Sequence, residues 1–244
     1  MASLTAADLL NAWELGLEQP DIWQPLALLH AALPEFSSEA LARLSVGRRD
    51  AYLLTLREWI FGPRLTGIAR CPACDQDLEL AFDSADIRAT PQAEPLETLS
   101  LTIDGYELQV RLPNSLDAAA VAGSADLTGA RRLLLDRCLT ATKVQGEAVS
   151  PDELPSAVLE LVVARMSEAD PQADVQLALC CPDCGHAWQT IFDIGSFLWS
   201  EVNAWAQRIL HEVHILASAY GWREAEILGL SPWRRQSYLE AVGQ

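Results

Sequence analysis

The sequence predicts an α+β protein in which helices outnumber strands. Apolar residues follow helical spacing at both ends of the chain, whereas strand-like alternation is confined to its middle. Two Cys-x-x-Cys turns with strand-like flanks lie in that middle part and suggest a zinc-ribbon-like β core with pseudo-two-fold halves. We expect a helical N-terminal module at residues 1–62, the β core at residues 63–195 and a C-terminal helical module at residues 196–244.

The N-terminal module reads as a series of short helices. Apolar residues from Leu4 to Gly62 recur at the spacing of a helix face. Helix-breaking residues divide the stretch into about four helices. They are Pro20, Pro25, Pro34 and Gly47.

Period-two alternation begins after Pro63. Residues 98–112 alternate on both sides of Asp104-Gly105, a dipeptide that favours a tight β-hairpin turn. Further strands are expected beside the cysteine turns, at residues 67–70, 78–82, 175–179 and 187–192. Residues 86–97, which include two prolines, are expected to form an exposed connector.

The hairpin opens an insert at residues 98–170 that also contains helices. Helical spacing is found at residues 115–121, 127–139 and 151–166, and Asn114 or Ser115 can cap the first of these helices.

The C-terminal module begins with a long amphipathic helix at residues 196–220. Its apolar stripe runs from Leu198 to Tyr220, and Gly221 ends it. Two short helices are expected after it, starting at Arg223 and at Pro232.

Two sequence echoes point to internal symmetry. The turn at residues 71–74 recurs 110 residues later at 181–184, and a Phe-Asp pair follows each turn at the same distance. The pattern Leu-Ser-x-x-Arg-Arg-x-x-Tyr-Leu at residues 44–53 recurs at residues 230–239. Because the two offsets differ, we expect two matching halves around an insert and not a solenoid of stacked repeats.

The second echo has two interpretations. It is an ordinary helix start, with Ser as N-cap and with Tyr and Leu facing the core. Alternatively, its paired arginines contact carboxylates of a neighbouring subunit. The arginines are Arg48, Arg49, Arg234 and Arg235.

Tryptophans are concentrated near the C-terminus, and they too have two interpretations. Core packing is one. The other is a docking face that includes Trp222 and Trp233, because large aromatic side chains are enriched at the centres of protein interfaces.

The four cysteines Cys71, Cys74, Cys181 and Cys184 are the predicted ligands of one structural zinc ion. Two thiolates on a tight turn can reach a tetrahedral ion, and two such turns complete a four-sulfur site. The 106 residues between the pairs far exceed the usual spacing of roughly 12 to 20. The insert must therefore leave the site and return to it.

Other uses of the cysteines stay open. Cys-Pro-x-Cys also occurs in dithiol oxidoreductases, although there a helix follows the pair; buried thiols without a metal are a third reading. Cys180 and His186 are close enough to compete as ligands, and Cys138 is expected in the core.

The sequence predicts no enzyme. Four cysteine ligands leave no open coordination position for a substrate or water. His211 and His214 are three residues apart, whereas the metalloprotease helix needs histidines four apart. No phosphate-binding or nucleophile-elbow motif is present.

Charge and hydropathy limit the partners. The chain has 34 acidic and 17 basic residues, and the resulting net charge of −17 argues against nucleic acid. The longest apolar stretches are shorter than the roughly 20 residues of a membrane span. The N-terminus does not read as a secretory signal, so we expect a cytoplasmic protein without a membrane partner.

The second cysteine turn, the Trp199–Trp205 helix region and residues 220–239 resemble baseplate proteins of contractile phage tails and related injection systems. Residues 71–83 and 111–117 share the resemblance. The resemblance is to T-even-type baseplate hub and hub-assembly proteins. The resemblance implies a non-enzymatic part, in a hetero-oligomeric assembly with baseplate, spike and tube proteins, that is incorporated into or assembles a phage-tail-like particle. The alternative is a zinc-ribbon adaptor of another protein complex.

Overall fold

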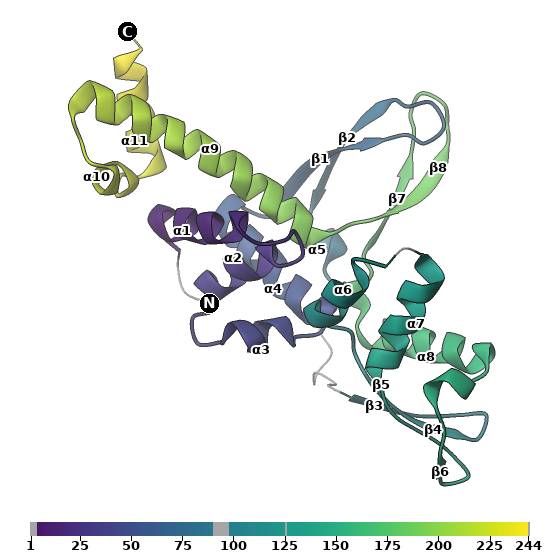
Figure 1. Cartoon of the computed structure of the whole chain (residues 1–244). Helices are drawn as coiled ribbons and strands as arrows, with labels where there is room; N and C mark the ends of the chain where they lie inside the picture. The colour runs from purple at the N-terminus through teal and green to yellow at the C-terminus, as the bar shows by residue number, and fades with distance from the viewer. Residues whose placement is uncertain (1–3, 90–97, 125, 244) are drawn as a thin grey trace. The chain divides into compact units, whose positions relative to one another are not determined.

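Helices at both ends of the chain and antiparallel sheets between them make this an α+β protein, as predicted (Figure 1). The computed structural model describes residues 4–89, 98–124 and 126–243. The chain forms two compact units, Met1–Leu41 with Gly195–Gln244, and Ala42–Ile194.

The first unit is helical. Its elements are α1 (Ala6–Leu17), α2 (Gln24–Ala32), most of α3 (Ser38–Ala42), α9 (Ile194–Tyr220), α10 (Glu224–Leu228) and α11 (Pro232–Val242). The short helices expected at both ends of the sequence are therefore present.

Helix α1 packs alongside α9 (Figure 1). The indole nitrogen of Trp13 donates a 3.0 Å hydrogen bond to Asn203 on α9. A Cβ atom at Gly16 would lie 2.4 Å from the ring of Trp199, so only glycine allows this approach of the two helices. Leu198, Val202 and Leu216 are fully buried along the predicted apolar stripe of α9.

The end of α9 and the two short helices after it share a small core. Leu216 and Ile227 are completely buried there, with Trp222 and Tyr238 packed against them. Trp222 stacks on Tyr220 and meets Tyr238 edge to face. The C-terminal helices are thus fixed to α9 by aromatic packing.

The second unit begins with α4 (Val46–Phe61) and carries two hairpins. One hairpin joins β1 (Arg64–Arg70) to β2 (Asp77–Asp83), and the other joins β7 (Gln176–Cys180) to β8 (Ala187–Ile191). The short helix α5 (Ser84–Ile87) follows β2. The strands expected beside the cysteine turns are therefore present with slightly different ends.

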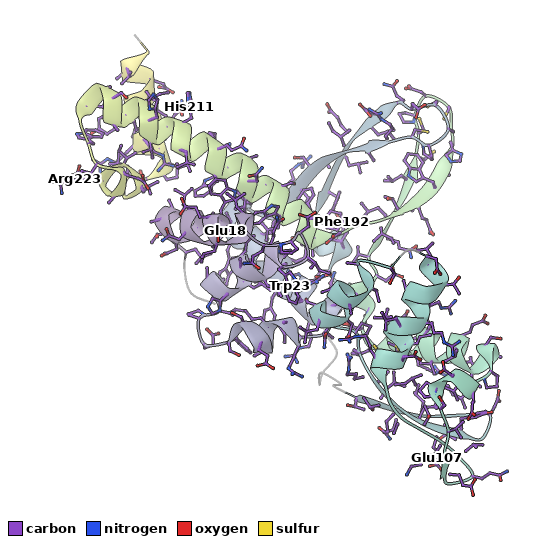
Figure 2. The ribbon with its side chains drawn as sticks, viewed as in Figure 1. Glu18, Trp23, Glu107, Phe192, His211 and Arg223 are labelled. Atoms are coloured by element: carbon purple, nitrogen blue, oxygen red, sulfur yellow. The ribbon has the colours of Figure 1, made fainter. Side chains whose placement is uncertain are left out.

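The insert between the hairpins has a four-stranded antiparallel sheet in the order β3 (Thr98–Ile103), β4 (Tyr106–Arg111), β5 (Leu139–Val144), β6 (Glu147–Ala148). Asp104 and Gly105 both have positive φ angles, which is the turn predicted between the first two strands. Glu107, labelled in Figure 2, lies in β4.

Helices complete the insert. They are α6 (Ser115–Val121), α7 (Leu127–Cys138) and α8 (Ser156–Ala169), with single 3₁₀ turns at Pro151–Glu153 and Pro171–Ala173. Val110, Cys138, Val158 and Val162 are buried together between sheet and helices. Cys138 is thus a core residue, as expected.

Three boundaries in this region differ from the sequence prediction. Strand β5 was not anticipated: the helix predicted to Leu139 ends at Cys138, and the chain continues into the sheet. The helix predicted from Pro151 begins at Ser156, because Pro155 provides the residue just before its first turn. The predicted connector begins inside α5, which ends at Ile87, and its residues 90–97 lie outside the described residues.

The insert returns to the N-terminus of α4. The Val46 N–H donates to the carbonyl of Pro113, at 2.9 Å, and the Gly47 N–H donates to Asp170 Oδ2, also at 2.9 Å. A Cβ atom at Gly47 would lie 2.0 Å from Asp170 Oδ1. The insert is therefore fixed at the first turn of α4 by Pro113, which follows its first hairpin, and by Asp170, its last residue.

Candidate metal centre

The two cysteine turns have the same backbone geometry. In the β1–β2 turn, the Cys71 N–H donates to the Gln76 carbonyl, and the Asp75 N–H donates to the Cys71 carbonyl. The β7–β8 turn repeats both bonds 110 residues later, from Cys181 to His186 and from Gly185 to Cys181. Asp75 and Gly185 both have positive φ angles. Such a turn directs both of its cysteine side chains to one point.

The turns bring the four predicted cysteines together. The Sγ atoms of Cys71 and Cys184 are 3.7 Å apart, as are those of Cys74 and Cys181. All four Sγ atoms lie within 4.8 Å of one another. Zinc–sulfur bonds of about 2.3 Å in a tetrahedron place sulfurs about 3.8 Å apart, so the geometry fits one four-coordinate ion.

One cysteine of each pair is buried and the other exposed. Cys71 and Cys181 lie among Leu78 and Trp188, whereas Cys74 and Cys184 face outward. This equivalent burial follows the pseudo-symmetry of the two turns and leaves one side of the site accessible to an ion in solution.

Crowding makes the ionisation of the thiols interdependent. Burial raises the pKa of the Cys71 thiol, but N–H groups of Ala73 and Cys74 and neighbouring thiols lower it to about 7. A backbone bond from Gln76 lowers the pKa of Cys74, but neighbouring thiols and burial raise it to about 12. A divalent cation would resolve this conflict, because it stabilises all four thiolates together.

The two competing ligands considered from sequence lie outside the cluster. The Cys180 thiol points to the carbonyls of Cys181 and Gly185 in its own turn. The exposed ring of His186 stacks on Trp188, with ring centroids 5.9 Å apart. Neither residue belongs to the group of metal-ligating side chains found among the described residues.

An aromatic contact joins the hairpins at the ends remote from the cysteines. The rings of Phe82 and Phe192 meet edge to face with centroids 5.6 Å apart, and Figure 2 labels Phe192 just after β8. These residues come from the two Phe-Asp pairs of the first echo. The hairpins are thus held together at both ends, by thiols at one and by phenylalanines at the other.

Residues of the second echo act as helix starts. Ser45 and Ser231 accept hydrogen bonds from the N–H groups of Arg48 and Arg234, so each serine caps its helix. Leu53 is buried, and Leu239 packs in the C-terminal core. The interpretation of the pattern as an ordinary helix start therefore holds for the backbone.

The four arginines of the echo are not equivalent. Arg49 is buried and donates to Asp50 and Ser115, and Arg235 is buried and donates to Glu212 and the Leu230 carbonyl. Arg48 is half-buried and Arg234 is exposed. The second arginine of each pair thus has its partners within the chain.

The two tryptophans considered for a docking face differ in exposure. Trp222 is half-buried in the aromatic cluster, whereas 79 % of Trp233 is exposed. His211, labelled in Figure 2, and His214 lie on the exposed surface of α9.

A second polar centre was missed in the sequence. The buried carboxylate of Asp117 accepts hydrogen bonds from Arg111 and Arg137 and from the N–H of Asn114. Asp117 is three positions after Asn114, which is the spacing of a reciprocal helix cap, and this spacing was the only signal of the centre in the sequence. It joins β4, α6 and α7 within the insert.

Comparison with known proteins identifies the family. The family described as T4 bacteriophage base plate protein matches residues 28–199, which is more than half of the chain. This chain belongs to that family. The match includes both cysteine turns of the baseplate protein and the whole insert. Residues 220–239, on which the sequence resemblance also relied, lie beyond it.

Two other comparisons gave no relatives for the baseplate protein: neither a curated protein nor a solved structure matched it. Among its described helices, none combines the length and apolar character needed to cross a bilayer.

Proposed function

We propose that this chain is a structural, non-enzymatic component or assembly factor of the baseplate of a contractile phage-tail-like injection system. The observation that carries the proposal is the family match over residues 28–199. Its partners are other baseplate, spike or tube proteins, as expected for a T-even-type hub or hub-assembly protein, and it works within or on the assembling particle.

A structural zinc ion bound by Cys71, Cys74, Cys181 and Cys184 is part of this proposal. Sulfur separations of 3.7 Å and the matching turns support a zinc-ribbon-like core. The ion would link two hairpins that are far apart in sequence. Its role is to hold the ends of the insert together, because the two hairpins that flank the insert form separate two-stranded sheets, and no strand pairing joins them among the described residues.

A structural role for the ion follows from its ligands. Four thiolates saturate a tetrahedral zinc and leave no position for a substrate or an activated water. The exposed histidines of α9 lack the spacing of a metalloprotease motif. The proposal therefore assigns the protein to assembly and assigns no catalytic residue.

Partner contacts are assigned to the exposed members of the predicted set. Trp233 and Arg234 lie next to each other at the start of α11, with Trp222 in the neighbouring aromatic cluster. Arg48 is the corresponding candidate on α4. Arg49 and Arg235 would act by positioning these helix starts.

The test is an affinity purification of the tagged protein from its native host, followed by mass spectrometry of partners and electron microscopy of the eluate. We expect baseplate, spike, tube or sheath proteins to co-purify. Presence of the chain in intact particles would identify a component, and its presence only in subassemblies would identify an assembly factor.

The proposed docking face is tested with a tagged Trp233→Ala, Arg234→Ala double variant, whose thermal stability should be unchanged, and the wild-type protein is the reference. We expect the variant to recover fewer baseplate partners. Equal recovery would exclude this docking face, and an eluate without any baseplate partner from the wild-type protein would contradict the proposed function.

A further inference from the structure

A groove lies between β2 and β7 in the second unit, on the metal-site hairpins but separate from the cysteines. It has a volume of about 510 Å³. Leu80, Ala81 and Phe82 of β2 line one side, and Val175 with the first four residues of β7 lines the other. Part of α5 and Pro171 complete the lining.

The side formed by β7 is an unpaired strand edge. The hydrogen bonds Cys181 N–H to His186 and Phe192 N–H to Val175 fix the register of the β7–β8 hairpin. In an antiparallel pair, alternate residues direct their main-chain groups toward the partner strand. Odd-numbered residues of β7 therefore face β8, and the N–H and C=O groups of Gln176 and Ala178 face away from it.

That edge is open to a further strand. Within the described residues, β7 pairs with β8 alone. Neither Gln176 nor Ala178 is a charged or proline residue of the kind that protects natural sheet edges. An extended peptide could therefore continue the main-chain ladder, as in other strand-addition complexes.

The opposite side supplies apolar contact. Leu80 and Phe82 are half-buried, and together with Leu177 and Leu179 of β7 they give the groove apolar side chains. Because side chains alternate along a strand, a strand added to β7 would place every second side chain toward these residues.

The charges at the groove select a basic partner. Asp86 lines it, and exposed Asp83 and Asp174 are next to lining segments. Arg88 is the basic residue of the lining, and its guanidinium is already bound to Glu58 at 2.8 Å. Arg64 lies opposite Asp83 in the β1–β2 register, so Asp86 and Asp174 supply the net negative charge beside the free edge.

We propose that the β2–β7 groove binds an extended segment of a partner protein, in which apolar residues alternate with Lys or Arg, and that this segment pairs with β7 through its main chain. The inference deepens the proposed baseplate function and rests on it for the source of the partner. The chemistry of the groove itself is independent of that source.

The experiment starts with a displayed library of random nine-residue peptides selected on the metal-loaded full chain. We expect enriched peptides to lack proline, to alternate apolar and basic residues, and to lose at least about threefold in affinity when Lys and Arg are changed to Glu. No enrichment, or enrichment of acidic peptides, would overturn the proposal.

Affinity of the best peptide is then measured for a matched pair of variants. Ala178→Pro removes the outward N–H of β7, and Gln189→Pro removes the outward N–H of its register partner on β8. Neither N–H belongs to the β7–β8 ladder. We expect at least about fivefold weaker binding for Ala178→Pro and less than about twofold change for Gln189→Pro. Equal losses, or none, would contradict strand addition.

Hydrogen–deuterium exchange of the wild-type chain gives a readout without substitution. Peptide binding should slow exchange at Gln176 and Ala178 but not at Gln189. Unchanged exchange at Ala178 with bound peptide would reject the proposed site. Host purifications that still recover baseplate partners in that case would leave the proposed function standing, so the two failures are distinguishable.

Discussion

Two exposed cysteines at the second turn, Cys180 and Cys184, have different surroundings, although their side chains are chemically identical. Cys184 lies in the thiol cluster, whereas the Cys180 side chain is exposed and outside it. We predict that Cys184→Ser and Cys74→Ser each bind about one zinc ion fewer per chain. We also expect the hairpins of both variants to unfold without cooperativity. Cys180→Ser is the matched control and should keep the metal. Elemental analysis of purified protein measures this, and a well-folded wild-type chain without metal would contradict it.

Asp117 shows how burial changes the value of an ion pair. Burial opposes its ionisation, but hydrogen bonds from Arg111, Arg137 and Asn114 lower the pKa of this carboxyl to about 2. We predict that Asp117→Ala destabilises the protein by about 3–5 kcal/mol, because it leaves two guanidinium groups without their buried partner.

Urea unfolding at neutral pH measures this loss, with Asp152→Ala as control. Asp152 pairs with Arg132 on the surface, so its removal should cost less than about 1 kcal/mol. The stabilisation by Asp117 should be present above about pH 4 and be lost as the pH falls toward 2. Similar losses in both variants would contradict the assigned difference in burial.

Asp50 has the opposite pH dependence. Burial raises its pKa to about 6, although the charge of Arg49 lowers it, and Asp193 and Asp170 add to the increase. The folded state therefore keeps a proton that the unfolded state loses near pH 4. We predict that this group makes folding less favourable as the pH rises from about 4 to about 6.

Carboxyl carbon NMR of the folded protein should give an Asp50 midpoint near pH 6, and Asp50→Asn should reduce the fall in stability over that interval. A midpoint near pH 4 would show that the carboxylate is ionised without penalty.

At the scale of elements, the start of α4 depends on the close approach of the insert. Asp170 accepts from the Gly47 N–H, and a side chain at position 47 would displace its carboxylate and meet the Ala173 backbone 2.9 Å away. We predict that Gly47→Ala destabilises the second unit by about 1–3 kcal/mol despite the higher helix propensity of alanine. Thermal unfolding measures the change.

The matched position of the second echo provides the control. Trp233 occupies it and is 79 % exposed, so Trp233→Ala should change stability by less than about 0.5 kcal/mol. The same sequence pattern thus tolerates a large residue where the side chain is exposed and requires glycine where Asp170 and Ala173 lie close. A stabilised Gly47→Ala variant would contradict this explanation.

At the scale of the molecule, all four cysteines and both ends of the insert belong to one unit, Ala42–Ile194. We predict that a fragment of residues 42–194 folds and binds about one zinc ion, because all four cysteines of the site lie within it. Circular dichroism and elemental analysis measure this. The same fragment with Cys184→Ser should be metal-free, and an unfolded parent fragment at saturating zinc would refute the prediction.

The sequence by itself determined most local structure. Asp104-Gly105, Asn114 and the prolines of the first module specify turns, caps and breaks through their own backbone preferences, and these were predicted at or near the observed residues. The grouping of the four cysteines was also predictable, because local sequence specifies each Cys-x-x-Cys turn. Strand β5 was not, because it follows α7 directly, and no glycine or proline marks the boundary between Cys138 and Leu139.

Only the tertiary structure decided which residues of the repeated sequence patterns are buried and which are exposed, and which of them have the same role. It buried Arg49 and Arg235 and left Arg234 exposed. It also placed Asp117 between two arginines. In the described residues it paired β7 with β8 alone, beside Leu80 and Phe82 of the groove. These properties depend on which segments, distant in sequence, approach a given side chain. Desolvation and ion pairing act through that approach, so neighbouring residues in the chain do not specify them.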